Sequence, residues 1–130
     1  MSIQSKSQRF ANAVFPHVLE VADGDPTEAG KYKTLCKKAG SLLRNSGLMQ
    51  TLAFFQARGQ KDIHFNILTT HIEKELVNLE ILPENSAPPD QYLFDQVRHS
   101  SVPVYMYYTR EVLHLLNWHK RLCDTLLIKD

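Results

Sequence analysis

Six histidines are the residues that most readily suggest metal chemistry. Glu111 and His114 form a Glu-x-x-His pair, the unit of helical di-metal sites, but the sequence lacks the second pair that such a site needs. His114 and His119 stand about 140° apart around a helix and cannot share an ion. His64 and His71 are about two turns apart, too far for joint ligation. We therefore expect hydrogen-bonded core or surface histidines, with no metal and no cofactor.

The two cysteines, Cys36 and Cys123, do not form a motif known for catalysis or redox chemistry. Cys36 falls on the apolar face of a helix beside Leu35 and Ala39, which favours a buried structural thiol over a nucleophile. A single bridge between the two cysteines is the alternative, and we expect free thiols. A phosphate-binding glycine loop, HExxH, CxxC and a nucleophile elbow are all absent from the sequence. The sequence predicts a protein that is not an enzyme.

Charge is distributed unevenly along the chain, although the formal net charge is only +1. Residues 29–61 contain seven basic residues and no acid, whereas residues 73–95 carry a net charge of −5. A surface that presents the basic block together favours a polyanionic partner. The alternative is that oppositely charged blocks neutralise each other within the fold.

Three bases of the basic block, Lys33, Lys37 and Arg44, fall within about 40° of one another on a helix and lie away from its apolar face. They span about 16 Å of helix rise, enough to follow two or three phosphates without reading base identity. Lys31 and Lys38 of the same helix are further candidate nucleic-acid contacts. An ordinary solvated lysine face is the alternative, but such faces usually retain acids for i,i+4 pairing.

Helical periodicity extends along the chain and strand alternation is almost absent, so we expect an all-α fold. The length fits one domain, residues 1–130, built as a compact bundle of about five or six helices. The expected helices cover residues 7–21, 25–46, 48–58, 62–82, 90–99 and 101–127. Pro16 should kink or split the first helix. Gly30 allows the second to begin as late as Lys31, and the proline-rich residues 83–90 should form a loop.

The last expected helix is apolar on more than one side, which indicates burial among neighbouring helices. Tyr105, Tyr107, Tyr108 and Trp118 are aromatic residues of the kind that stack on bases, but their helical spacing favours the core. No apolar run approaches the roughly 18 residues of a membrane span. The first ten residues also lack the apolar stretch of a signal peptide. We expect a soluble, cytoplasmic protein without membrane contact.

Two segments resemble the small helical subunit of type III-B CRISPR (Cmr) effector complexes. Residues 31–55 match that family's basic helix, its Asn-x-Gly-Leu turn and the helix of Gln-Thr-Leu-Ala-Phe type that follows. Residues 108–121, Tyr-Thr-Arg-Glu-Val-Leu-His-Leu-Leu-Asn-Trp-His-Lys-Arg, are similar to its closing helix, which ends in a tryptophan and a basic pair. Together these segments cover about a third of the chain.

The resemblance implies a non-catalytic subunit that stacks with further copies of itself into a minor filament, beside the guide-bearing subunits. The stacked copies would line the channel that holds guide RNA and target RNA, while other Cmr subunits cut. Gly47 would permit a left-handed backbone at the turn, and Leu48 would fill the core. The implied RNA-backbone contacts are Lys33, Lys37 and Arg44 of the basic helix and Arg110, Lys120 and Arg121 of the closing helix.

A helix-turn-helix DNA-binding regulator is the alternative function, because residues 35–56 also predict a helix, a short glycine turn and a second helix. The second of these helices would be the recognition helix. It is mostly apolar and offers only Gln50, Thr51 and Gln56 to base edges, which favours a place in the core.

Overall fold

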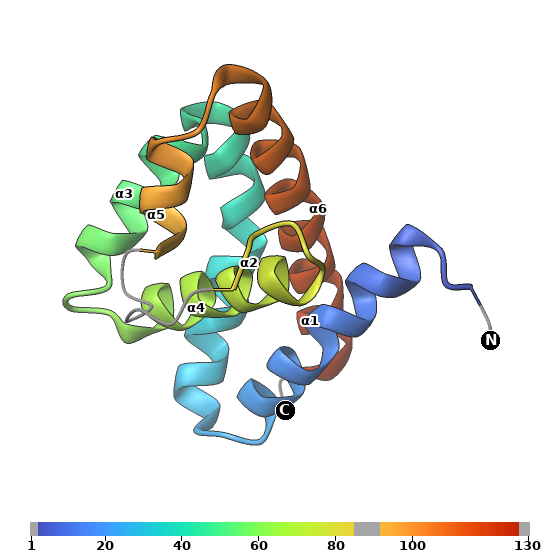
Figure 1. Cartoon of the computed structure of the whole chain (residues 1–130). Helices are drawn as coiled ribbons and strands as arrows, with labels where there is room; N and C mark the ends of the chain where they lie inside the picture. The colour runs from blue at the N-terminus through green and yellow to red at the C-terminus, as the bar shows by residue number, and fades with distance from the viewer. Residues whose placement is uncertain (1–2, 85–91, 128–130) are drawn as a thin grey trace.

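The computed structural model describes residues 3–84 and 92–127, and their regular structure is entirely α-helical (Figure 1). This confirms the all-α bundle predicted from the periodicity. The helices are α1 (Lys6–Ala22), α2 (Pro26–Ser46), α3 (Leu48–Arg58), α4 (Ile63–Asn78), α5 (Tyr92–Arg98) and α6 (Val102–Leu126). None of the helices in these two stretches is both long and apolar enough to cross a bilayer.

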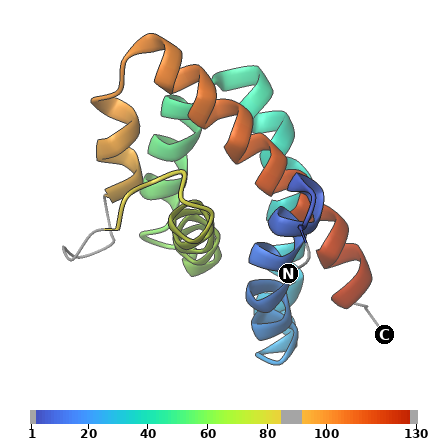
Figure 2. The same ribbon diagram turned by 45° about the vertical axis from the view of Figure 1, so that its right-hand side comes forward.

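The two longest helices, α2 and α6, pack along each other and form the frame of the bundle. Helix α1 packs against α6, α4 and α2, and α3 packs against α4, α2 and α5. Figure 2 shows α4 nearly end-on, with α1 on one side of it and with α3 and α5 on the other. The core lies where α1, α2, α4 and α6 meet, around Val14, Tyr32, Leu68 and Leu115, each at most 1% exposed.

Helix α1 continues through Pro16, so the predicted split is not found. A proline lacks the N–H that would bond the carbonyl four residues earlier, which here belongs to Asn12. Asn12 and Pro16 both face solvent, where water can bond the freed carbonyl group. The helix begins with a capping box, in which the Ser5 hydroxyl accepts from the Gln8 N–H and the Gln8 side chain accepts from the Ser5 N–H.

Helix α2 begins at Pro26, and the later start at Lys31 that Gly30 allowed is wrong. The Asp25 carboxylate accepts from the Thr27 N–H at 3.0 Å, and Pro26 occupies the first helical position, where its missing N–H costs nothing. A Cβ placed on Gly30 would meet no atom within 4 Å, so this glycine serves no close approach within the described residues. The cap therefore outweighs the low helix propensity of glycine.

Gly47 alone joins α2 to α3, with φ 83° and ψ 163°. The positive φ was predicted, but the ψ value places the residue in an extended region open essentially only to glycine, not in the left-handed helical region. Leu48 follows at 1% exposure and fills the core as expected. The Met49 N–H at the start of α3 donates to the Tyr105 hydroxyl of α6 at 3.1 Å, which replaces an ordinary side-chain cap.

Helix α4 ends at Asn78, four residues before the predicted end at Leu82. Glu80 has φ 62°, and the Ile81 N–H donates to the Leu76 carbonyl at 2.8 Å, a Schellman-type ending with glutamate at the usual glycine position. Leu82 is still buried, because the chain folds back onto the core after the turn. Of the predicted proline loop, residues 85–91 lie outside the described residues, as does the expected helix start at Asp90.

Helix α6 is the long C-terminal helix that the sequence predicted, with Ser101 at its N-cap and Pro103 in its first turn. Its burial differs along its length. From Tyr108 onward one face is buried against α1 and α2, whereas Val102 and Met106 in the first turns are 73% and 60% exposed. Among the aromatic residues considered above, Tyr108 is buried and Tyr107 is partly exposed.

Candidate nucleic-acid interface

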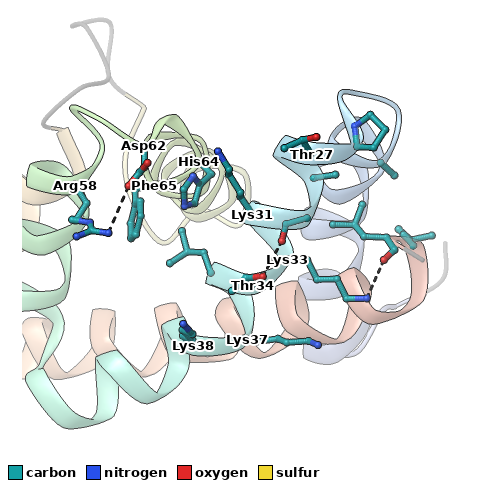
Figure 3. Close-up of a pocket in the computed structure, with 17 residues that line it drawn as sticks. Thr27, Lys31, Lys33, Thr34, Lys37, Lys38, Arg58, Asp62, His64 and Phe65 are labelled. Carbon is teal, nitrogen blue, oxygen red and sulfur yellow. Dashed lines mark hydrogen bonds and ion pairs between the residues drawn. The ribbon is translucent and has the colours of Figure 1, made fainter. Parts of the chain in front are cut away.

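An open groove of about 1110 Å³ lies along the N-terminal half of α2, between the start of α4 and the end of α6 (Figure 3). Four lysines of α2 line it, and Arg58 at the end of α3 adds a fifth positive charge. Asp62 is the one acid among the described residues of the lining. The basic residues of the groove are Lys31, Lys33, Lys37, Lys38 and Arg58.

The amphipathic pattern of α2 determines which side chains face the groove. Tyr32, Leu35 and Cys36 are buried on the inner face, and the lysines between them are left on the outer face. Figure 3 shows Lys31 extending from α2 toward His64 and Phe65 at the start of α4. Two helices that are distant in sequence therefore present their polar residues to one open space.

The positive charges of the groove are only weakly neutralised. Lys31 lies 3.7 Å from a carboxylate oxygen of Glu28, an exposed pair of the kind worth at most about 1 kcal/mol. Within residues 3–84 and 92–127, Lys37 and Lys38 form no ion pair. Both are exposed and remain available to an anion.

Lys33 has a different role from its neighbours. Its Nζ donates to the Leu127 carbonyl oxygen at 3.0 Å, the contact drawn dashed in Figure 3. A cation at this place bonds a carbonyl at the C-terminal end of α6 and complements the negative end of the helix dipole. The side chain is half-buried and is engaged in holding α6 against α2.

The structure separates the predicted contact residues into two groups. It brings Lys31, Lys33, Lys37 and Lys38 together in the groove. The remaining candidates are exposed but do not line it. These are Arg44 on α2 and Arg110, Lys120 and Arg121 on α6. Sequence reasoning did not identify Arg58 and His64 as lining residues. Arg58 belongs to the basic block of residues 29–61, and this position was a sequence signal that could have indicated its role.

On the inner face of α2, Tyr32 belongs to a buried polar network that joins four helices. The Tyr32 hydroxyl lies 2.8 Å from His71 Nδ1 and 3.0 Å from His119 Nδ1. His119 Nε2 lies 2.8 Å from both carboxylate oxygens of Glu75, and His17 Nδ1 lies 2.6 Å from Glu75 Oε2. Glu75 and His119 are completely buried. We call these five residues the buried network.

One arrangement of protons satisfies the contacts of the buried network. His119 donates from Nε2 to the Glu75 carboxylate, so its neutral ring accepts from the Tyr32 hydroxyl at Nδ1. The Tyr32 oxygen then accepts from His71 Nδ1. Burial lowers the pKa of His71 and of His119 to about 3, which keeps both rings neutral at pH 7. Burial raises the pKa of Glu75 to about 7, against the opposing effect of the hydrogen bond from His17.

The other candidates for chemistry are engaged in structural contacts. Glu111 is buried and accepts from Lys6 Nζ at 3.0 Å, which ties the start of α1 to α6, while His114 lies 3.9 Å from it. The described residues contain no group of three or more side chains arranged to hold a metal ion. Cys36 and Cys123 are both buried free thiols, as expected, and burial raises the pKa of Cys36.

Comparison with known proteins shows the family to which this chain belongs. The model of the family described as CRISPR-associated protein (Cas_Cmr5) matches residues 6–126. The chain belongs to this family. The match covers all of the helices of the described regions, and it confirms the resemblance found in residues 31–55 and 108–121.

One curated relative is the CRISPR system Cmr subunit Cmr5 of Thermus thermophilus. It is 29% identical over 125 residues, which are 96% of this chain and 98% of the relative. A crystal structure of a CRISPR-associated Cmr5 family protein from the same organism superposes with a TM-score of 0.77 at 27% identity. The superposition covers 95% of this chain and 98% of that one. The Cas_Cmr5 fold thus extends over nearly the whole chain.

Helix α3 does not have the surface of a recognition helix. Thr51, one of three side chains available to bases in the regulator alternative, is buried, and its hydroxyl donates to the Leu42 carbonyl oxygen at 3.3 Å. Leu52 and Phe55 are buried with it. The helix is part of the core, as its apolar sequence indicated.

Proposed function

We propose that this chain is a non-catalytic subunit of a type III-B CRISPR Cmr complex and contacts the RNA backbone through the α2 groove. Membership of the Cas_Cmr5 family supports the assignment to the complex. The observation that carries the RNA contact is the gathering of Lys31, Lys37, Lys38 and Arg58 around one groove. Contacts from lysines to phosphates carry no sequence information, so the groove would hold RNA of any sequence.

Replacing Lys31, Lys37 and Lys38 together by alanine tests the RNA contact. All three are exposed and lie off the apolar face, so the fold should persist. RNA affinity should fall equally for two unrelated sequences. The slope of log affinity against log salt should decrease by roughly 0.7 for each phosphate that the variant no longer neutralises. Binding is measured with the full-length chain and, as RNA retention, with the assembled complex.

A matched control is the triple replacement of Arg9, Lys74 and Arg98 by alanine. It removes the same number of exposed positive charges from α1, α4 and α5, outside the groove. We expect a much smaller change in salt slope. An equal loss in both triple variants would show that net charge, and not the groove, attracts RNA, and would contradict the proposal.

The proposed stacking of copies is supported by two exposed apolar ridges. Val102 and Met106 form one at the start of α6, and Phe15 and Leu19, each more than 40% exposed, form the other on α1. Each pair is spaced i,i+4 and therefore lies on one side of its helix. Contacts between unlike ridges would continue from copy to copy and build a filament.

Charge substitutions in the two ridges test this stacking. Met106→Asp and Phe15→Asp should each reduce self-association of the chain, measured by sedimentation at increasing concentration. A mixture of the two variants should still form dimers, because each retains one intact ridge. Failure of the mixture to associate would contradict a contact between unlike ridges. Nuclease activity of the pure chain with divalent metals, lost on replacing one carboxylate or histidine, would contradict the non-catalytic assignment.

A further inference from the structure

The side of the groove opposite the lysines is built from planar groups. It is formed at the α3–α4 junction, where Arg58, His64 and Phe65 line the groove and Phe54 stands beside them, 44% exposed. The Phe54 and Phe65 rings meet edge to face at 5.9 Å between centroids. We call Arg58 and His64 the planar edge, because these two present flat polar groups to the groove.

Arg58 is held in place from several directions. Its guanidinium carbon lies 5.8 Å from the Phe54 ring centre and 5.7 Å from that of Phe65, and its NH2 lies 3.6 Å from an Asp62 carboxylate oxygen. The side chain is nevertheless 56% exposed. The contacts thus fix an accessible cationic plane, which lysine, with a point charge, does not provide.

His64 contributes a second flat group beside Lys31 (Figure 3). Its ring centre lies 4.6 Å from that of Phe65, at an angle of 41° between the planes. Its Nδ1 is buried and has no hydrogen-bond partner among the described residues. An unpartnered buried nitrogen reduces stability. His64 is therefore poorly explained by the fold, and its ring surface in the groove is what it offers to a ligand.

We propose that the planar edge stacks on unpaired bases of a single RNA strand whose phosphates lie on the α2 lysines. This inference rests on the proposed function and adds to it that the groove distinguishes unpaired from paired RNA. Proteins that bind single strands combine a basic track with aromatic or guanidinium planes, because every base has a π-face. In a duplex the base faces are stacked inside the helix and cannot reach Arg58 or His64.

Three RNA ligands of equal length test the inference with the full-length chain: a single strand, the same strand with abasic sites, and a duplex. Arg58→Lys retains the charge and removes the plane. It should weaken binding of the base-bearing strand by roughly 5- to 140-fold, the range expected for one stacked base. Binding of the abasic strand should change less than about twofold.

Two substitutions at His64 provide the matched pair. His64→Ala should reduce the preference for the base-bearing strand over the abasic strand, and His64→Phe, which keeps a flat ring, should restore it. Melting curves of each variant check that the fold persists. An unchanged preference in Arg58→Lys and in His64→Ala would overturn the inference, as would equal affinity of the wild-type chain for the single strand and the duplex.

The same experiment separates this inference from the proposed function. If the lysine triple variant binds all three RNAs as the wild type does, or if the wild type binds none at low salt, the RNA groove itself is refuted. If the lysine triple variant loses RNA binding, but Arg58→Lys and His64→Ala leave the preference for the base-bearing strand over the abasic strand unchanged, only the stacking is refuted. An acidic peptide serves as the last competitor. If it binds as well as the abasic strand, and if neither the base-bearing single strand nor the duplex displaces it, the groove binds a protein partner and the inference is overturned.

Discussion

The groove and the buried network occupy opposite faces of α2 and differ in how their polar groups are partnered. Tyr32 on the inner face lies within 3.0 Å of two imidazole nitrogens. On the outer face, Lys37 and Lys38 have no ion-pair partner within the described residues. Buried polar groups must be paired for the fold to be stable, whereas exposed charges contribute little to it and remain free for a ligand. The inner face of α2 thus contributes to the stability of the fold, and the outer face is available to bind a ligand.

The largest effect on stability should come from Glu75→Ala. The carboxylate accepts from His17 and His119, and its removal leaves a fully buried imidazole N–H without a partner and opens a cavity. We expect a loss of about 3 kcal/mol in the free energy of unfolding, measured by urea denaturation. Glu20→Ala, at an exposed acid of α1, is the control and should be nearly neutral. Equal stability of the two variants would mean that the network does not stabilise the core.

A pH series tests the same network without a substitution. His71 and His119 have an ordinary pKa of 6.5 and a folded pKa of about 3, so their contribution is complete above pH 6.5 and is lost as the pH falls toward 3. The pKa of Glu75, raised from 4.5 to about 7, acts oppositely: its contribution is complete below pH 4.5 and lost as the pH rises through 7. Between pH 4.5 and 6.5 the unfolded chain therefore binds one more proton than the folded chain.

Stability should accordingly fall by about 1.4 kcal/mol per pH unit as the pH decreases through that window. In Glu75→Gln the opposing carboxyl group is gone, and the slope should approach about 2.7 kcal/mol per pH unit. Urea denaturation at several pH values measures both slopes. Identical slopes in the two proteins would show that Glu75 titrates normally and would contradict its raised pKa.

A smaller effect should distinguish two lysines of the same groove. Lys33→Ala removes the donor to the Leu127 carbonyl and should cost about 1 kcal/mol, whereas Lys37→Ala, one turn away, should be neutral within about 0.5 kcal/mol. Thermal melting of both variants gives the comparison. If Lys33→Ala does not change the stability of the protein, Lys33 belongs with Lys31, Lys37 and Lys38, the lysines available to a ligand.

The smallest change in stability should come from the triple replacement of Lys31, Lys37 and Lys38 by alanine. Alanine is a strong helix former and none of the three lysines packs in the core, so the free energy of unfolding should change by less than about 0.5 kcal/mol. Calorimetry checks this value. A large loss of stability would mean that the groove also supports the fold, and the separation between the faces of α2 would fail.

Local signals in the sequence were sufficient where the decisive interactions are local. Asp25 and Pro26 started α2, and Gly47 ended it, through contacts within a few residues. The end of α4 was misplaced because Glu80 adopts a positive φ that glutamate rarely takes, and the buried Leu79 and Leu82 continued the helical pattern beyond the turn. Periodicity records which residues are buried, not whether the backbone between them is helical.

The buried network and the planar edge were beyond sequence reasoning for a different reason. His17, Tyr32, Glu75 and His119 come from four helices, and their pairing depends on how those helices pack. The sequence indicated only that some histidines would be hydrogen-bonded in the core. Arg58 faces the α2 lysines because α3 folds back beside α2, which no spacing within one helix reveals.

The single-residue joint at Gly47 has a consequence for the thermodynamics of binding. Since α2 passes into α3 without an intervening linker, and Tyr105 fastens the first turn of α3 to α6, the backbone that carries the lysines and Arg58 is already in place before a ligand arrives. A binding surface that is already formed loses little conformational entropy when a ligand arrives. The backbone of the groove should therefore add little to the entropic cost of association, and the ordering cost should come from the exposed lysine side chains and from the RNA strand.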